Sequence, residues 1–362
     1  MNKKKRKSKT DLQYALLSML ENSLGESLLA IARDDFEKGL KDPTQIEAAI
    51  SNSLGAAMLD TLPRQVLERL LANAPSMLQE RRQEDQEFEE RNFMRWQRAF
   101  DAIETMAEVA AEVGGACDKE GRSLAQFEND YRFEALSQLF PRALLVTREI
   151  IHLLKGGFPD AALSRWRSLH ELTVTAIFIS RNDGNVAMRY LANFDFQAKR
   201  AAKQFNHHAQ RANLKPFSAE ELAEIDARFA LAVKAVGGEI EGDWGWAAPA
   251  LKKDRPTFAD LEKDVGLDHW RPRYKWASQH VHSGHRPSDK LLGLCEAKQP
   301  VMLVGRSNSG FTDPLHMTAI SLMQIATTVL LKSPNIDRVV YSRILMTLSD
   351  SIGQLSLECE SK

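Results

Sequence analysis

The sequence predicts an all-α protein, a multi-helix bundle with a smaller N-terminal helical region. Apolar residues recur at a period of about 3.6 residues along nearly the whole chain, and the alternation typical of strands is scarce. Glycine pairs and prolines separate these periodic stretches, as expected where helices end and begin. With 362 residues and 43% hydrophobic content, the chain is long enough to form two domains.

Three regions follow from this pattern. Residues 1–10 are rich in lysine and arginine and are predicted to be a solvated, disordered tail, with contact to an acidic partner such as RNA as the alternative. Residues 11–115 are predicted to form an N-terminal helical region, whose short helices end near Leu78 and whose last helix stops at Gly114-Gly115. Residues 129–362 are predicted to form a C-terminal helical domain that contains the polar site.

Helix ends are most clearly marked in the C-terminal domain. A helix through Leu154 should end at Gly156-Gly157, and Pro159 should lie in the first turn of the next helix, which predicts an antiparallel hairpin. Ser218 is expected to cap a helix together with Glu221. Further helices are predicted at 185–211, 218–236, 272–282, 314–331 and 336–357, and one short strand-like run at 301–304.

Composition and the absence of known sequence motifs argue against several classes of function. The net charge of −1 gives the chain as a whole no electrostatic attraction to nucleic acid. Three widely spaced cysteines argue against a disulfide framework and favour a cytoplasmic location. The chain has no apolar run long enough to span a membrane, so we expect no membrane association. Without a GxSxG, Rossmann or P-loop motif, kinase, hydrolase and dehydrogenase functions have no support.

Residues 156–180 read as a helix that is apolar on nearly every side and that nevertheless contains Arg165, Arg167, His170 and Glu171. Such a helix is normally surrounded by other helices, and a buried charge without a partner costs several kcal/mol. We therefore expect Arg167 and Glu171 to be largely buried. At least one of them should contact the helix predicted at 272–282.

The helix predicted at residues 272–282 contains a polar stripe. Tyr274, Ser278 and His282 recur every four residues and so share one face. In the last turn, the helix dipole would raise the pKa of His282, which would suit it to proton donation near neutrality. The alternative is that the stripe is only a hydrogen-bonded contact between helices.

Four histidines close together, at positions 269, 280, 282 and 285, suggest a metal site, but their spacing argues against one. Residues two apart on a helix point about 200° apart, so His280 and His282 cannot share a metal. We predict no structural metal and no cofactor. A helical metalloenzyme would require a carboxylate from another helix.

Phosphate contact is expected from arginines in or beside these segments. Arg306 lies in the glycine-bounded segment 305–310, which either binds an anion or serves as an ordinary connector. Arg165 and Arg271 are the other two candidates. In the loop 237–256, Trp244-Gly245-Trp246 either anchors the loop to the core or offers a stacking surface.

Two blocks of residues resemble a family. Gly157-x4-Ala162-x2-Arg165-x-Arg167-x2-His170-Glu171, followed by Tyr274-x3-Ser278-x3-His282, is similar to an uncharacterised bacterial family of all-helical proteins, a domain of unknown function. The resemblance covers about residues 131–331, and the first block is its more specific part. It implies a helical fold and no particular activity.

A looser resemblance involves Arg273 and His280, two turns apart on another face of the same predicted helix. Arg273-x6-His280 is similar to the signature of HEPN ribonucleases, helical proteins of toxin and defence systems. The resemblance implies that Arg273 steadies the scissile phosphate. It also implies that His280 acts on the ribose 2′-OH or the leaving oxygen without a metal, and that the protein is a homodimer.

The leading hypothesis is therefore a metal-independent endoribonuclease of bacterial toxin or phage-defence type, with RNA, a second copy of the chain and a protein of such a system as partners. Its expected catalytic residues are Arg167, His170, Glu171, Arg273, Tyr274, Ser278, His280 and His282. The rival hypothesis is a non-enzymatic helical interaction or sensor protein, in which the same residues form a buried polar network.

Overall fold

The computed structural model describes residues 62–123, 130–282, 285 and 287–361, together with isolated positions between 25 and 51. The predicted basic tail, residues 1–10, and the first part of the predicted N-terminal helical region lie outside the described residues. The chain divides into two compact units between Phe88 and Glu89, and the second unit contains the site. None of the described helices has the length and apolar character needed to cross a membrane.

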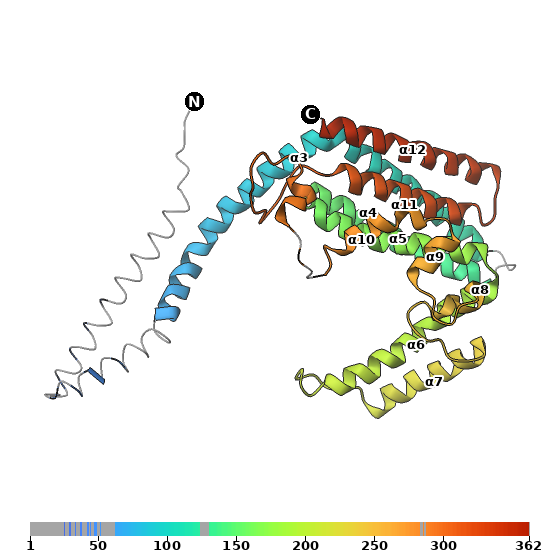
Figure 1. Cartoon of the computed structure of the whole chain (residues 1–362), viewed down its shortest axis with the longest axis horizontal. Helices are drawn as coiled ribbons and strands as arrows, with labels where there is room; N and C mark the ends of the chain where they lie inside the picture. The colour runs from blue at the N-terminus through green and yellow to red at the C-terminus, as the bar shows by residue number, and fades with distance from the viewer. Residues whose placement is uncertain are drawn as a thin grey trace. The chain divides into compact units, whose positions relative to one another are not determined.

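The all-α prediction is confirmed: the described residues form ten α-helices and short 3₁₀ turns, without strands (Figure 1). The α-helices are α3 (Leu62–Ser123), α4 (Tyr131–Lys155), α5 (Pro159–Arg181), α6 (Gly184–His208), α7 (Ala219–Val236), α8 (Ala248–Leu251), α9 (Phe258–Asp264), α10 (Arg271–Ser278), α11 (Thr312–Leu330) and α12 (Ile336–Glu360). The run at 301–304, predicted to be strand-like, is irregular.

Helix α5 lies at the centre of the bundle and packs against α4, α11, α10 and α9. Its buried residues point in every direction around its axis, as its apolar pattern predicted. The indole of Trp166 donates a hydrogen bond to the Met317 carbonyl on α11 at 3.0 Å. Most side chains of α5 therefore pack against neighbouring helices.

The α4–α5 hairpin has the predicted ends. Gly157 adopts a positive φ of 85°, which favours glycine, and the Phe158 N–H donates to the Leu153 carbonyl at 2.8 Å. Pro159 begins α5, where its missing N–H costs nothing. These local signals place the start of α5 directly after the turn.

Helix α3 differs from the prediction. It runs without interruption from Leu62 through Gly114 and Gly115 to Ser123, so neither the short helices ending near Leu78 nor the helix end at the glycine pair is observed. A Cβ atom at position 114 would lie 2.0 Å from Cε1 of Phe140 on α4. Gly114 therefore permits close helix packing instead of ending a helix.

Helices α6 and α7 form an antiparallel hairpin that extends from the bundle (Figure 1). The predicted capping box at the start of α7 is confirmed: the Ser218 hydroxyl accepts from the Glu221 N–H, and the Glu221 carboxylate accepts from the Ser218 N–H. After α7, the loop folds back onto the bundle, where Trp246 is buried beside Phe178 and Tyr190. Trp246 thus anchors the loop to the core.

Candidate functional site

The polar network at the centre of the site begins with a buried pair. His170 on α5 and Glu262 on α9 are both shielded from solvent, and His170 Nε2 lies 3.0 Å from Glu262 Oε1. The second carboxylate oxygen of Glu262 accepts from Arg271 Nη1 at 2.7 Å. One carboxylate therefore links three helices, α5, α9 and α10, and neither of its oxygens is left without a hydrogen bond.

The network continues through Tyr274. Its hydroxyl donates to Glu171 Oε1, and Glu171 also pairs with Arg167, one turn earlier on α5, at 3.2 Å. The guanidinium groups of Arg167 and Arg271 lie 4.8 and 5.0 Å from the centre of the Tyr274 ring. Burial, reinforced by the Glu171 carboxylate, raises the pKa of Tyr274 to about 12. The phenol is therefore a hydrogen-bond donor at neutral pH.

The structure confirms the predicted contact between the two sequence blocks and corrects the predicted burial. Both Glu171 and Arg167 reach Tyr274 on α10, as expected. Their side chains are 26% (Arg167) and 30% (Glu171) exposed, so they lie at the edge of the network and are only partly buried. His170, in contrast, is enclosed.

Helix α10 is shorter than predicted, and this breaks up the predicted stripe. It ends at Ser278, whose hydroxyl donates to the Tyr274 carbonyl at 2.8 Å, so only these two stripe residues share the helix. His282 lies beyond the helix end and is exposed. The expectation that the helix dipole acts on His282 from the last turn is therefore wrong.

Arg273 and His280, the pair similar to the HEPN signature, each contact a different acidic residue. Arg273 Nη1 lies 2.5 Å from Asp313 at the start of α11. His280 follows α10 and turns toward Asp160 at the start of α5, with its Nε2 3.5 Å from Oδ1. Asp160 also accepts from the backbone N–H groups of residues 292 and 293. The two side chains are thus held by two separate carboxylates.

The three arginines expected to bind phosphate are also paired with carboxylates. Arg165 contacts Glu149 on α4, Arg306 lies 2.6 Å from Glu89 on α3, and Arg271 belongs to the network. Segment 305–310 is fastened to α3, because its Asn308 carbonyl accepts from the Trp96 indole at 2.9 Å. A phosphate at any of these arginines would compete with an existing ion pair.

A cleft of about 350 Å³ opens beside the network, between α4, α5, α6 and the loop before α8. Glu171 belongs to both the cleft and the network. Asn193 Oδ1, also in the cleft lining, is shielded from solvent and has no hydrogen-bond partner. The polar lining consists of Arg142, Arg165, Ser168, Glu171, Thr175, Tyr190, Asn193 and Asp243, beside Trp244 and Trp246.

The comparison with family models covers the part of the chain that contains both polar blocks. Residues 133–300 match the model of a family of unknown function, DUF5677. We call this segment the DUF5677 domain. It contains nearly all of α4 and extends past α10, and it leaves out α3, α11 and α12. No curated protein and no solved structure matches the chain. The match gives no link to HEPN ribonucleases.

Sequence reasoning missed two residues of the DUF5677 domain that hold the site together. Glu262 lies in a short helix of mixed charge, Phe258–Asp264, and no motif distinguishes it from the acidic residues beside it. Asp160 follows Pro159 and looks like an ordinary first-turn acidic residue. Only their contacts with His170 and His280, far away in sequence, show their role.

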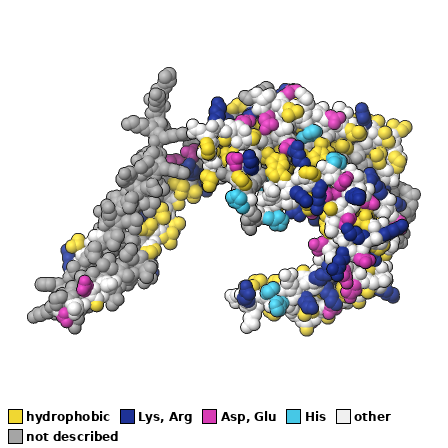
Figure 2. Space-filling view, in the orientation of Figure 1, with side chains coloured by type: hydrophobic (Ala, Val, Ile, Leu, Met, Phe, Trp, Pro, Cys, Tyr) yellow, Lys and Arg dark blue, Asp and Glu magenta, His cyan; other side chains and the backbone are white. Residues whose placement is uncertain are grey.

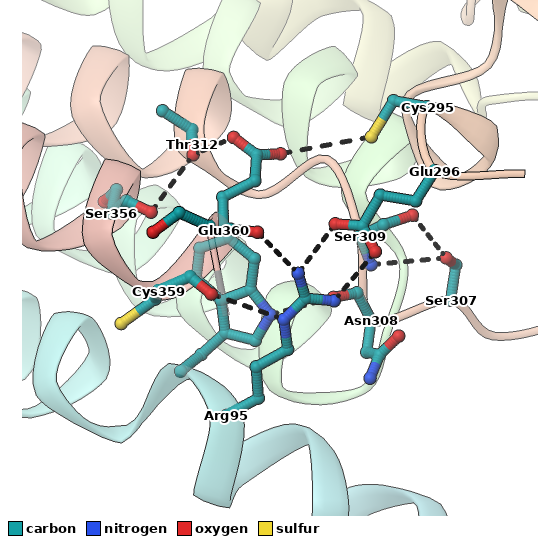
Figure 3. A network of polar contacts seen from close by, with 12 residues as sticks. Arg95, Cys295, Glu296, Ser307, Asn308, Ser309, Thr312, Ser356, Cys359 and Glu360 are labelled. Carbon is teal, nitrogen blue, oxygen red and sulfur yellow. Dashed lines mark hydrogen bonds and ion pairs between the residues drawn. The ribbon is translucent and has the colours of Figure 1, made fainter.

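A second polar network is centred on Arg95, which lies before the DUF5677 domain, and it includes Cys295 and Glu296 near the end of that domain (Figure 3). Arg95 pairs with both oxygens of Glu296 and donates to the carbonyls of Asn308, Cys359 and Glu360. Potential metal-ligand atoms of Cys295, Glu296 and Glu360 all lie within 4.8 Å of one another. Because Arg95 already supplies the positive charge there, this cluster fastens the end of α12.

Proposed function

We propose that the protein is a non-enzymatic helical sensor or interaction protein, in which the polar network is structural and the adjoining cleft binds a small polar ligand. The burial of the central pair of the network supports this proposal. Its buried pair, His170 and Glu262, is enclosed by three helices, whereas a general acid or base must come within hydrogen-bonding reach of its substrate. The pair can hold helices together but cannot meet an RNA strand.

Glu171 gives the sensor proposal its physical basis. It lines the cleft, and it also accepts the Tyr274 hydroxyl that fastens α10 to α5. A ligand that hydrogen-bonds Glu171 competes with Tyr274, so occupancy of the cleft changes how firmly α10 is held. A ligand shifts such an equilibrium by its difference in affinity for the two arrangements.

The lining of the cleft indicates the chemistry of the ligand. The Glu171 carboxylate accepts hydrogen bonds, Arg165 offers donors, and Trp244 offers an aromatic surface. A flat ring with hydroxyl or amino groups meets all three requirements. Ribonucleosides have this chemistry and serve as probes.

The rival proposal, a metal-independent endoribonuclease, rests on the His280–Asp160 pair, because a carboxylate beside a histidine can orient it for proton transfer. It lacks electrostatic support on the face shown in Figure 2, where basic and acidic side chains are interspersed and neither gathers into one patch. We therefore favour the sensor, and a cleavage assay distinguishes the two.

The first experiment incubates the full chain with total RNA in EDTA, in parallel with the variants His280→Ala and His282→Ala. We expect intact RNA in every sample. His280→Ala should lower Tm because it removes the ion-pair partner of Asp160. His282→Ala, at an exposed position, serves as the control and should leave Tm unchanged. Cleavage by the parent, abolished by His280→Ala at unchanged Tm, would replace the sensor with the ribonuclease.

The second experiment measures the Tm of the full chain with each of the four common ribonucleosides. At least one should raise Tm, because a ligand that binds only the folded state stabilises it. Asn193→Leu should abolish the rise, and Asn185→Leu, at the exposed start of α6, should leave it intact. If no ribonucleoside raises Tm, the proposed ligand class is wrong.

A further inference from the structure

A second pocket, of about 480 Å³, lies where the start of α4, the ends of α5 and α11 and the loop after α9 come together. This volume is in the range of small-molecule sites. The pocket shares no lining residue with the cleft beside the polar network. The inference below is therefore independent of the proposed function.

Positive charge is in excess in this pocket. Arg132 on α4, Arg181 on α5 and Lys332 after α11 line it, and no carboxylate is among the described residues of the lining. Lys332 is paired, because its Nζ lies 2.5 Å from Asp130 outside the lining. Neither arginine has an ion-pair partner within the described part of the chain. An anion in the pocket would therefore not have to displace a carboxylate from either of them.

Both arginines are accessible to a ligand, since their side chains are exposed. Arg181 Nη1 donates to the Val265 carbonyl at 3.1 Å, which holds the guanidinium against the wall of the pocket. Its remaining N–H groups can bind a ligand. Arg132 lies in the first turn of α4, where the helix dipole disfavours a cation. A bound anion would offset that unfavourable interaction.

The charges indicate which anion the pocket suits. A guanidinium presents its N–H groups as a planar fork that matches two oxygens of a phosphate or a carboxylate. A phosphate monoester has nearly two negative charges at neutral pH and can neutralise both arginines. A single carboxylate would leave one of them without a counter-charge. The pair of arginines therefore favours a phosphate monoester.

The pocket also offers hydrogen-bond acceptors. Ser180, Thr327 and Thr328 line it with partly exposed side chains. Each hydroxyl donates its proton to a carbonyl of its own helix, at 2.7 to 2.8 Å. The hydroxyl oxygen keeps lone pairs that accept from a ligand. A ligand with hydroxyl groups can donate to these oxygens.

We propose that this pocket binds a small phosphate monoester that has several hydroxyl groups, as the phosphates of sugars and polyols do. Arg132 and Arg181 hold the phosphate group, and the ligand hydroxyl groups donate to Ser180, Thr327 and Thr328. The unpaired arginines select the anion, and the committed hydroxyl protons select a ligand that donates.

The test titrates the full chain with ribitol 5-phosphate, ribitol and inorganic phosphate, and isothermal titration calorimetry measures each Kd. Ribitol 5-phosphate should bind most tightly. Ribitol should bind at least about tenfold more weakly, because it loses the charge-assisted hydrogen bonds to the arginines. Inorganic phosphate keeps those bonds but lacks the ligand hydroxyl groups, so it should bind about threefold to tenfold more weakly than ribitol 5-phosphate.

Two substitutions locate the site. Arg132→Gln and Arg181→Gln should each weaken the binding of ribitol 5-phosphate by about tenfold or more. Arg132 is exposed and has no ion-pair partner among the described residues, so Arg132→Gln should keep the Tm of the parent. The control is Arg211→Gln, which removes the same charge at an exposed position after α6 and should bind like the parent.

Two outcomes would overturn the proposal. One is a parent that binds ribitol 5-phosphate no more tightly than ribitol or inorganic phosphate. The other is binding of ribitol 5-phosphate that survives both arginine substitutions unchanged.

Discussion

Glu262 Oε1 lies 3.0 Å from Nε2 of His170, with the two side chains 0% and 1% exposed, although 92 residues separate them in sequence. Arg271 completes the group on the second carboxylate oxygen. The contact places a carboxylate from α9 against the central helix α5. The buried part of the polar network holds helices of the bundle together, and Arg165 and Glu171 line the cleft.

Replacing Glu262 should therefore act on stability. Glu262→Ala leaves Arg271 without its partner and His170 without its hydrogen bond, so unfolding free energy should fall by about 3–5 kcal/mol. Chemical denaturation measures it. Glu224→Ala, an exposed glutamate on α7, should change it by no more than about 0.5 kcal/mol. Equal effects of the two substitutions would show that the buried carboxylate does not hold the helices.

Tyr274 should make stability depend on pH in the alkaline range. Its pKa is raised from 10.0 to about 12, chiefly by burial. The folded protein holds this proton more tightly than the unfolded chain, so its contribution is complete below about pH 10 and is lost as pH rises toward 12. Tyr274→Phe should flatten that decline in denaturation experiments. Tyr341→Phe, at an exposed position on α12, is the control, and its unfolding free energy should fall with rising pH as steeply as that of the parent.

Neighbouring glycines on α3 should respond to the same substitution with opposite signs. Gly114→Ala forces a Cβ atom against the Phe140 ring and should destabilise the protein by about 1–3 kcal/mol. Gly115→Ala meets no neighbour and should stabilise it by up to about 1 kcal/mol, because alanine favours helix. Denaturant midpoints of the two variants measure both effects. A loss of stability in both would contradict the packing described for α3 and α4.

Arg95 should hold the end of α12. Arg95→Lys keeps the charge but cannot reproduce the paired contacts with Glu296 or the bonds to three carbonyls (Figure 3). Hydrogen exchange at the last turn of α12 should therefore accelerate, with little change in α5. The control is Arg98→Lys. Arg98 forms an exposed ion pair with Glu358, so this substitution should leave hydrogen exchange in α12 unaltered.

Local sequence was sufficient for the long helices after α3 and for several of their ends, and it missed the short helices α8 and α9. The all-round apolar pattern of α5, the turn at Gly157 and the capping box of Ser218 and Glu221 involve residues within a few positions of one another. Such interactions depend on backbone geometry and short-range hydrogen bonds, which a sequence displays directly. The polar residues of both blocks could be identified for the same reason, and the contact between the blocks was inferred from the cost of burying charge.

Tertiary packing decided the rest. Gly114 lies inside α3, where the Phe140 ring occupies the space that a Cβ atom would take. Helix α10 ends at Ser278, and His280 then turns toward Asp160. Glu262 is the partner of His170 because α9 packs against α5. Each of these outcomes depends on residues distant in sequence, because a buried charge is stabilised by whichever group the fold brings within hydrogen-bonding distance. The pattern of a single segment contains no information about that group.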